Sequence, residues 1–70
     1  MTAMELVKFI AKKKKRSMAW LSRANGESQN QVYARMTAGD VKFEVWKRYL
    51  KSLGCEIVVR DLYSPDEWRM

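Results

Sequence analysis

Residues 17–36, SMAWLSRANGESQNQVYARM, contain the pattern that decides the fold. Ser17 and Ser28 each precede a short stretch with apolar residues at helical spacing, and serine is a favoured helix N-cap. Asn25-Gly26 separates the two stretches and predicts a helix stop, because glycine adopts the left-handed conformation at no steric cost. This order of helix, glycine-containing turn and helix predicts a helix-turn-helix.

The flanking segments predict two further helices and a strand. The apolar positions recur at helical spacing on both sides of residues 17–36, and the stretch after Gly54 is rich in β-branched residues. Residues 64–67 predict a turn that a helical turn could follow. The fold class expected is mainly α, with four to five short helices, a helix-turn-helix and a short C-terminal β-strand. The expected elements are helices from residue 2 or 3 to about 14, about 18–25, about 29–37 and 41–53, and a strand within 55–60.

Length and composition predict one small domain without catalytic or metal chemistry. Seventy residues allow a single core, expected over about 3–54, with a β extension and tail over 55–70. The chain has no His and one Cys, Cys55, so it lacks the ligands for a usual zinc site and the groups for a disulfide framework or imidazole catalysis. We therefore expect no enzyme activity, no metal, no cofactor and no small-molecule ligand. No apolar run is long enough for a membrane span, and the start lacks the order of signal-peptide regions, so a cytoplasmic protein is expected.

The net charge of +6 comes from 14 Lys and Arg against 8 Asp and Glu, and it is concentrated early in the chain. Residues 8–23 hold seven cations and no acid, and residues 12–16 form an unbroken run, KKKKR. A basic run beside a folded domain suits a polyanion, since each cation that meets a phosphate releases counterions. A solvated helix end is the structural alternative. An anionic membrane surface would need a longer amphipathic helix before the run, so nucleic acid is the first expectation.

Residues 4–60 resemble the lambda-repressor-like, Cro-type family of phage and bacterial DNA-binding domains. Within the helix-turn-helix, the positions that fit the family pattern are Leu21, Ser22, Gly26, Ser28 and Val32. The stretch 43–57, FEVWKRYLKSLGCEI, is similar to the family's closing helix, which commonly ends in Leu-Gly before a short β segment. The resemblance implies sequence-specific binding of double-stranded DNA by a small, repressor-like transcriptional regulator. Three positions depart from it, since polar residues stand where the family usually has apolar ones: Asn25, Glu27 and Arg35.

In a helix-turn-helix the second helix lies in the major groove with its N-terminal residues against base edges. Amide side chains at its start suit adenine, which offers a donor and an acceptor together. The expected base contacts are Ser28, Gln29, Asn30, Gln31, Tyr33 and Ala34. Phosphate contacts are expected from the start of the first helix and from cations near the second, namely Lys15, Arg16, Ser17, Arg35 and Lys42. The alternatives are an ordinary solvated helix face for the amides, packing against a neighbouring helix for Tyr33 and capping alone for Ser28.

Two questions stay open at this stage. The strand needs a partner, which either a second copy supplies, making a homodimer through Ile57, Val58 and Val59, or the tail supplies by folding back on its own domain. The alternative function is a protein-interaction module, antitoxin-like or a phage accessory protein, that uses the same fold to bind an acidic partner. RNA binding is a lesser option, because the aromatic platforms of RNA-binding modules are absent.

Overall fold

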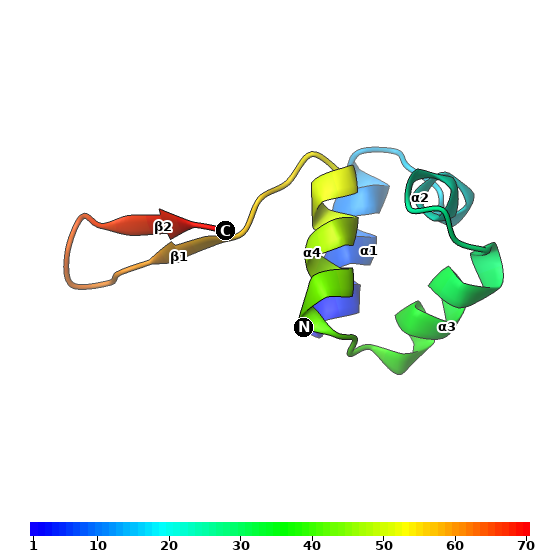
Figure 1. The fold of residues 1–70 in the computed structure, drawn as a ribbon, viewed down its shortest axis with the longest axis horizontal. Coiled ribbons are helices and arrows are strands. Elements are labelled where there is room, and N and C mark those ends of the chain that lie inside the picture. Colours follow the sequence, from blue (N-terminus) through cyan, green and yellow to red (C-terminus); the bar gives the residue numbers. More distant parts are fainter.

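Four helices and a β-hairpin follow one another in the computed structural model, which describes residues 1–70 (Figure 1). The expected fold class is confirmed, with the last helix two residues shorter at its start than expected and the strand confined to the end of residues 55–60. The elements are α1 (Ala3–Lys13), α2 (Met18–Ala24), α3 (Gln29–Ala38), α4 (Phe43–Ser52), β1 (Val58–Arg60) and β2 (Glu67–Arg69).

The helices of the helix-turn-helix begin at the two serines that the sequence predicts as caps. The Ser17 Oγ accepts a hydrogen bond from the Trp20 N–H at 3.0 Å, and the Ser28 Oγ accepts one from the Gln31 N–H at 3.2 Å. Thr2 caps α1 in the same way. Each cap supplies a partner for one of the N–H groups that a helix start leaves without one.

The end of α1 is unusual because a lysine occupies a left-handed conformation there. Lys15 has φ 58°, and its N–H donates to the Lys12 carbonyl at 3.1 Å while the Arg16 N–H donates to the Ala11 carbonyl at 2.8 Å. These two bonds form a Schellman motif, in which glycine is the usual residue at the left-handed position. The equivalent position after α4 is Gly54, with φ 77°.

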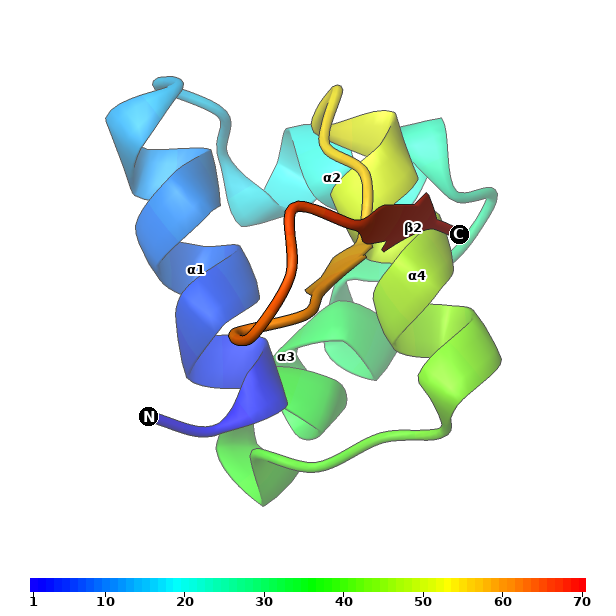
Figure 2. The same cartoon turned by 90° about the vertical axis from the view of Figure 1, so that its left-hand side faces the viewer.

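The core lies between the helices, and α1 and α4 run parallel along one side of it (Figures 1 and 2). The Trp46 Nε1–H donates to the Ala3 carbonyl at 3.0 Å near the start of both helices. The Lys14 ammonium donates to the Leu53 carbonyl at 2.7 Å near their ends. The α2–α3 pair packs against the layer that α1 and α4 form. The fully buried apolar side chains are Met4, Val7, Ala11, Leu21, Val32 and Tyr49, with Leu50 and Leu53 nearly so.

Two aromatic residues of α4 differ in burial. Tyr49 is fully buried, whereas Phe43 is 44% exposed. Phe43 is the first residue of α4 and lies outside the core. The centre of its ring is 6.2 Å from the centre of the Trp46 ring. Tyr49 packs in the core cluster, and its hydroxyl has charged partners inside the molecule.

The C-terminal segment folds back on itself as a hairpin and projects from the helical body, at the opposite end from α2 and α3 (Figure 1). The strands are antiparallel, with Val59 opposite Trp68 and Arg60 opposite Glu67. The expectation of a helical turn after residues 64–67 is wrong, because Glu67-Trp68-Arg69-Met70 alternates polar and apolar residues, a strand period. β1 therefore finds its partner within the chain. Ile57 and Cys55 anchor the hairpin by packing against the core.

We expect Lys15→Gly to raise the free energy of unfolding by about 1 kcal/mol, because the left-handed conformation costs a residue with a Cβ roughly that much. Thermal unfolding should show a midpoint about 4–8 °C higher, as is usual for a change of this size in a small domain. The control is Lys12→Gly, which removes the same charge inside α1 and should lower the midpoint. A lower midpoint for Lys15→Gly would contradict the strained conformation.

Candidate nucleic-acid interface

One face of α3 is open to solvent and carries four of the residues expected to contact bases. Gln29, Asn30, Tyr33 and Ala34 are all exposed, at positions i, i+1, i+4 and i+5, which share one side of a helix. Val32 is buried on the opposite side. Tyr33 is 52% exposed, so it does not pack as a core residue. These four residues, which we call the α3 outer face, form a continuous surface of amide, phenol and methyl groups.

The other two expected base contacts form a capping box at the start of α3. The Gln31 Oε1 accepts a hydrogen bond from the Ser28 N–H at 3.1 Å, reciprocal to the bond that the Ser28 Oγ accepts. The Ser28 and Gln31 oxygens therefore hold the helix start, and the Gln31 Nε2 remains free to donate. The spacing Ser-x-x-Gln is the sequence signature of this motif and could have predicted the arrangement.

Four of the five expected phosphate contacts lie at the two connections that flank the α2–α3 pair. Lys15, Arg16 and Ser17 are in the connection from α1 to α2, and Lys42 is the N-cap residue of α4 in the connection from α3 (Figure 1). The three cations among them are exposed, and none has a carboxylate within ion-pair distance. The Ser17 Oγ is already occupied by the Trp20 N–H.

The fifth, Arg35, lies instead in an internal network around Glu27. The Glu27 carboxylate, 10% exposed, forms a close ion pair with Arg35 and a second one with Arg48 at 3.1 Å. It also accepts a hydrogen bond from the Tyr49 hydroxyl at 2.6 Å. The Arg35 guanidinium donates to the same hydroxyl at 2.7 Å. We call these four residues the Glu27 network. It joins the turn between α2 and α3 to both α3 and α4, so Arg35 has a structural role.

The network shifts the pKa values of its members in directions that favour the ion pairs. Burial alone would raise the pKa of the Glu27 carboxyl, but hydrogen bonds from Tyr49 and Arg35 and the arginine charges outweigh it, and the pKa is lowered. Burial, and then the hydrogen bond to Glu27, raise the pKa of the Tyr49 hydroxyl. The hydrogen bonds to Glu27 and Tyr49 raise that of Arg35.

Asn25, another of the departures from the resembled family, also has internal partners. Its Nδ2 donates to the Leu21 carbonyl at 2.9 Å and to the Ser52 hydroxyl at 3.2 Å, which ties the turn to the end of α4. The turn between α2 and α3 is therefore held by hydrogen bonds or ion pairs of all three of these polar residues, Asn25, Glu27 and Arg35.

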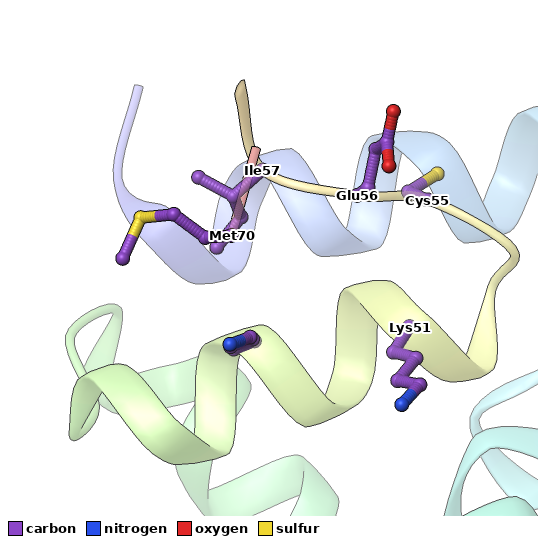
Figure 3. Close-up of a pocket in the computed structure, with 6 residues that line it drawn as sticks. Lys51, Cys55, Glu56, Ile57 and Met70 are labelled. Carbon is purple, nitrogen blue, oxygen red and sulfur yellow. The ribbon is translucent and has the colours of Figure 1, made fainter. Parts of the chain in front are cut away.

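Two hollows lie on the surface of the molecule. One, of about 280 Å³, lies between α4 and the base of the hairpin (Figure 3). Its charged lining residues are Lys47, Lys51 and Glu56, of which Lys51 and Glu56 point away from each other. A second hollow of similar volume lies beside Arg16 and Trp20. No cluster of three or more His, Cys, Asp or Glu is present, and no helix has the length and apolarity that crossing a membrane requires.

Comparisons with known proteins give no relative for this chain. No family model matches it, and no curated protein and no solved structure matches it at a significant level.

We expect Glu27→Gln to lower the free energy of unfolding by about 2 kcal/mol at neutral pH, because it leaves two arginines beside a neutral group. The pKa of Glu27 is lower in the folded chain than its ordinary value of 4.5, so its contribution is present above about pH 4.5 and is lost as pH falls below that value. Denaturant unfolding between pH 3 and 7 should therefore show a smaller acid loss in Glu27→Gln. The control is Glu56→Gln, whose pair with Arg69 at 3.4 Å is exposed. Equal acid sensitivity of Glu27→Gln and the unmodified chain would contradict the assignment.

Proposed function

We propose that this chain binds double-stranded DNA sequence-specifically, as a small repressor-like transcriptional regulator of phage or bacterial type. The observation that carries the proposal is the α3 outer face, an exposed amide-bearing helix side flanked by unpaired cations. A B-DNA major groove is wide enough to admit an α-helix. No catalytic step is part of the proposal. Such a regulator works in the cytoplasm, where a lone thiol like that of Cys55 stays reduced.

The α3 outer face offers suitable chemistry for reading base edges. Gln29 and Asn30 can each donate to and accept from adenine, which presents N6 and N7 in the major groove. Tyr33 and Ala34, one turn further along, present apolar surface to a thymine methyl group. The capping box leaves the Gln31 Nε2 as a third donor at the helix start. An A·T-containing site is the target that these groups fit best.

The cations would supply the sequence-independent part of the binding energy. Lys15 and Arg16 on one side of α2–α3 and Lys42 on the other can each neutralise a phosphate and release counterions. The net charge of +6 adds a long-range attraction to the duplex. Binding should therefore weaken steeply as salt concentration rises.

Selection from a random duplex library at about 150 mM salt tests the proposal, since low salt inflates non-specific binding by any basic protein. We expect an enriched site. Gln29→Ala and Asn30→Ala should each relax base preference, costing about 1–3 kcal/mol of discrimination at one position, whereas Lys42→Ala should weaken binding to all sequences. The control for Lys42→Ala is Lys13→Ala, which removes the same charge at the end of α1, from a residue outside the expected phosphate contacts.

Two outcomes would contradict this function. Unchanged affinity and base preference in Gln29→Ala and Asn30→Ala would remove α3 from the groove. Absence of any enriched site, with only weak and salt-sensitive binding, would favour the protein-interaction module. A complex with an acidic protein partner would then resist competition by unrelated duplex DNA, whereas a DNA complex would not.

We also propose that the chain forms a homodimer through the hairpin. Because side chains alternate along a strand, Ile57, Val59, Trp68 and Met70 share one side of the hairpin, which we call the hairpin apolar face. Val58 lies on the other side, with Arg60, Glu67 and Arg69. Trp68 is 54% exposed, and a two-stranded hairpin is marginally stable alone. A second copy packed on this face would bury it and stabilise both hairpins.

We expect Trp68→Ser to shift a dimer to monomer in sedimentation experiments at micromolar concentration, because it removes the largest side chain of the hairpin apolar face. Tyr63→Ser, in the hairpin turn, is the control and should leave the dimer intact. In the library selection, Trp68→Ser should recover single half-sites where the unmodified protein recovers a palindrome. An unmodified chain that remains monomeric at all concentrations would contradict the homodimer.

A further inference from the structure

Arg16, two residues before α2 begins, is stacked on an aromatic ring within that helix. The Arg16 guanidinium carbon lies 4.6 Å from the centre of the Trp20 ring. Trp20 is the third residue of α2, and its N–H is the one that caps on the Ser17 hydroxyl. Its ring also packs, half-buried, against the core. The cap fixes the backbone of Trp20 and the core contacts its side chain, so the ring provides a defined surface for the arginine.

Arg16 has no internal partner that would compete with an external anion. None of the chain's carboxylates lies within ion-pair distance of it, and no hydrogen bond uses its guanidinium. This contrasts with Arg35, whose guanidinium also lies beside an aromatic ring but is neutralised by Glu27. Stacking on a tryptophan face leaves the edge of a guanidinium available, because the hydrogen-bond donors lie in its plane.

The stack lies beside a hollow that one other cation, Lys14, also lines. Arg16 and Trp20 line the second hollow together with Lys14, Ser52, Leu53 and Gly54. The Lys14 ammonium already donates to the Leu53 carbonyl at 2.7 Å, so it neutralises the end of α4. Arg16 is thus the cation of this hollow that remains without a partner, and Lys15 lies next to it in the chain.

We infer that Trp20 is a positioning residue, which holds the Arg16 guanidinium in the orientation that binds one phosphate of a DNA backbone. The inference rests on the proposed function and extends it to a residue that does not itself touch DNA. A free arginine loses rotamer freedom when it forms a bidentate phosphate contact, and a stacked one has lost much of it already. Because α2 packs against α3, a phosphate fixed here would also help to set how α3 enters the groove.

The test is a double-mutant cycle on binding of a labelled duplex at several salt concentrations. Arg16→Ala should weaken binding about tenfold and reduce the salt slope by about one, as loss of one phosphate contact does. Trp20→Leu, which keeps apolar bulk, should weaken binding to specific and random duplexes alike by about two- to fivefold. The double variant should bind no worse than Arg16→Ala, since Trp20 acts only through Arg16. Trp20→Phe, which keeps an aromatic ring, should bind the duplex nearly as well as the unmodified protein.

The outcomes separate the inference from the function on which it rests. Losses that multiply in the double variant, or a Trp20→Phe variant as weak as Trp20→Leu, would overturn the positioning role while leaving DNA binding in place. Absence of duplex binding by the unmodified protein would overturn both. If Trp20→Leu does not fold, Arg16→Lys decides, since it keeps the charge but loses the planar fork. It should weaken binding severalfold at an unchanged salt slope, and full affinity would overturn the inference.

Discussion

The carboxylate of Glu27 is the constraint on which the orientation of α3 depends. α3 has a single fully buried side chain, Val32, and one partly buried apolar side chain, Met36, so its apolar contact with the core is small. Glu27 supplies what is missing, because it lies in the turn before α3 and binds Arg35 of α3 together with Arg48 and Tyr49 of α4. The α3 outer face points away from the core because its opposite side is held by these bonds.

Hydrogen bonds and ion pairs differ from apolar contacts in how strictly they define the orientation of a helix. Apolar side chains of similar volume often match or exceed a buried ion pair in stability, since removing charges from water is costly. Hydrogen bonds, however, are directional, and the Tyr49 hydroxyl must at once donate to Glu27 and accept from Arg35. A rotation of α3 relative to α4 would break several bonds together. In a domain of 70 residues with a small core, such a network can define one helix orientation.

The fold could be predicted from the sequence where short-range signals decide it, as at the Ser17 and Ser28 caps. The Glu27 network could not, because its members come from two helices and a turn and no local pattern links them. The sequence leaves open whether the tail or a second copy pairs with β1, because Glu67-Trp68 permits a helical turn, whereas the alternation through Met70 indicates a strand. The position of Val32 predicts the exposure of Gln29 and Asn30, and the Ser-x-x-Gln spacing predicts the bonds of Gln31.

The basic run illustrates why a charge pattern does not determine what each charge does. Lys12 and Lys13 are exposed in the last turn of α1, where the helix dipole favours cations. Lys14 crosses to the end of α4, Lys15 bears a left-handed backbone, and Arg16 stacks on Trp20. A glycine would relieve the strain at Lys15, but it would also remove a cation next to Arg16. A lysine at this position is therefore unfavourable for the isolated fold, and in the DNA complex that we propose its charge would face the phosphate backbone.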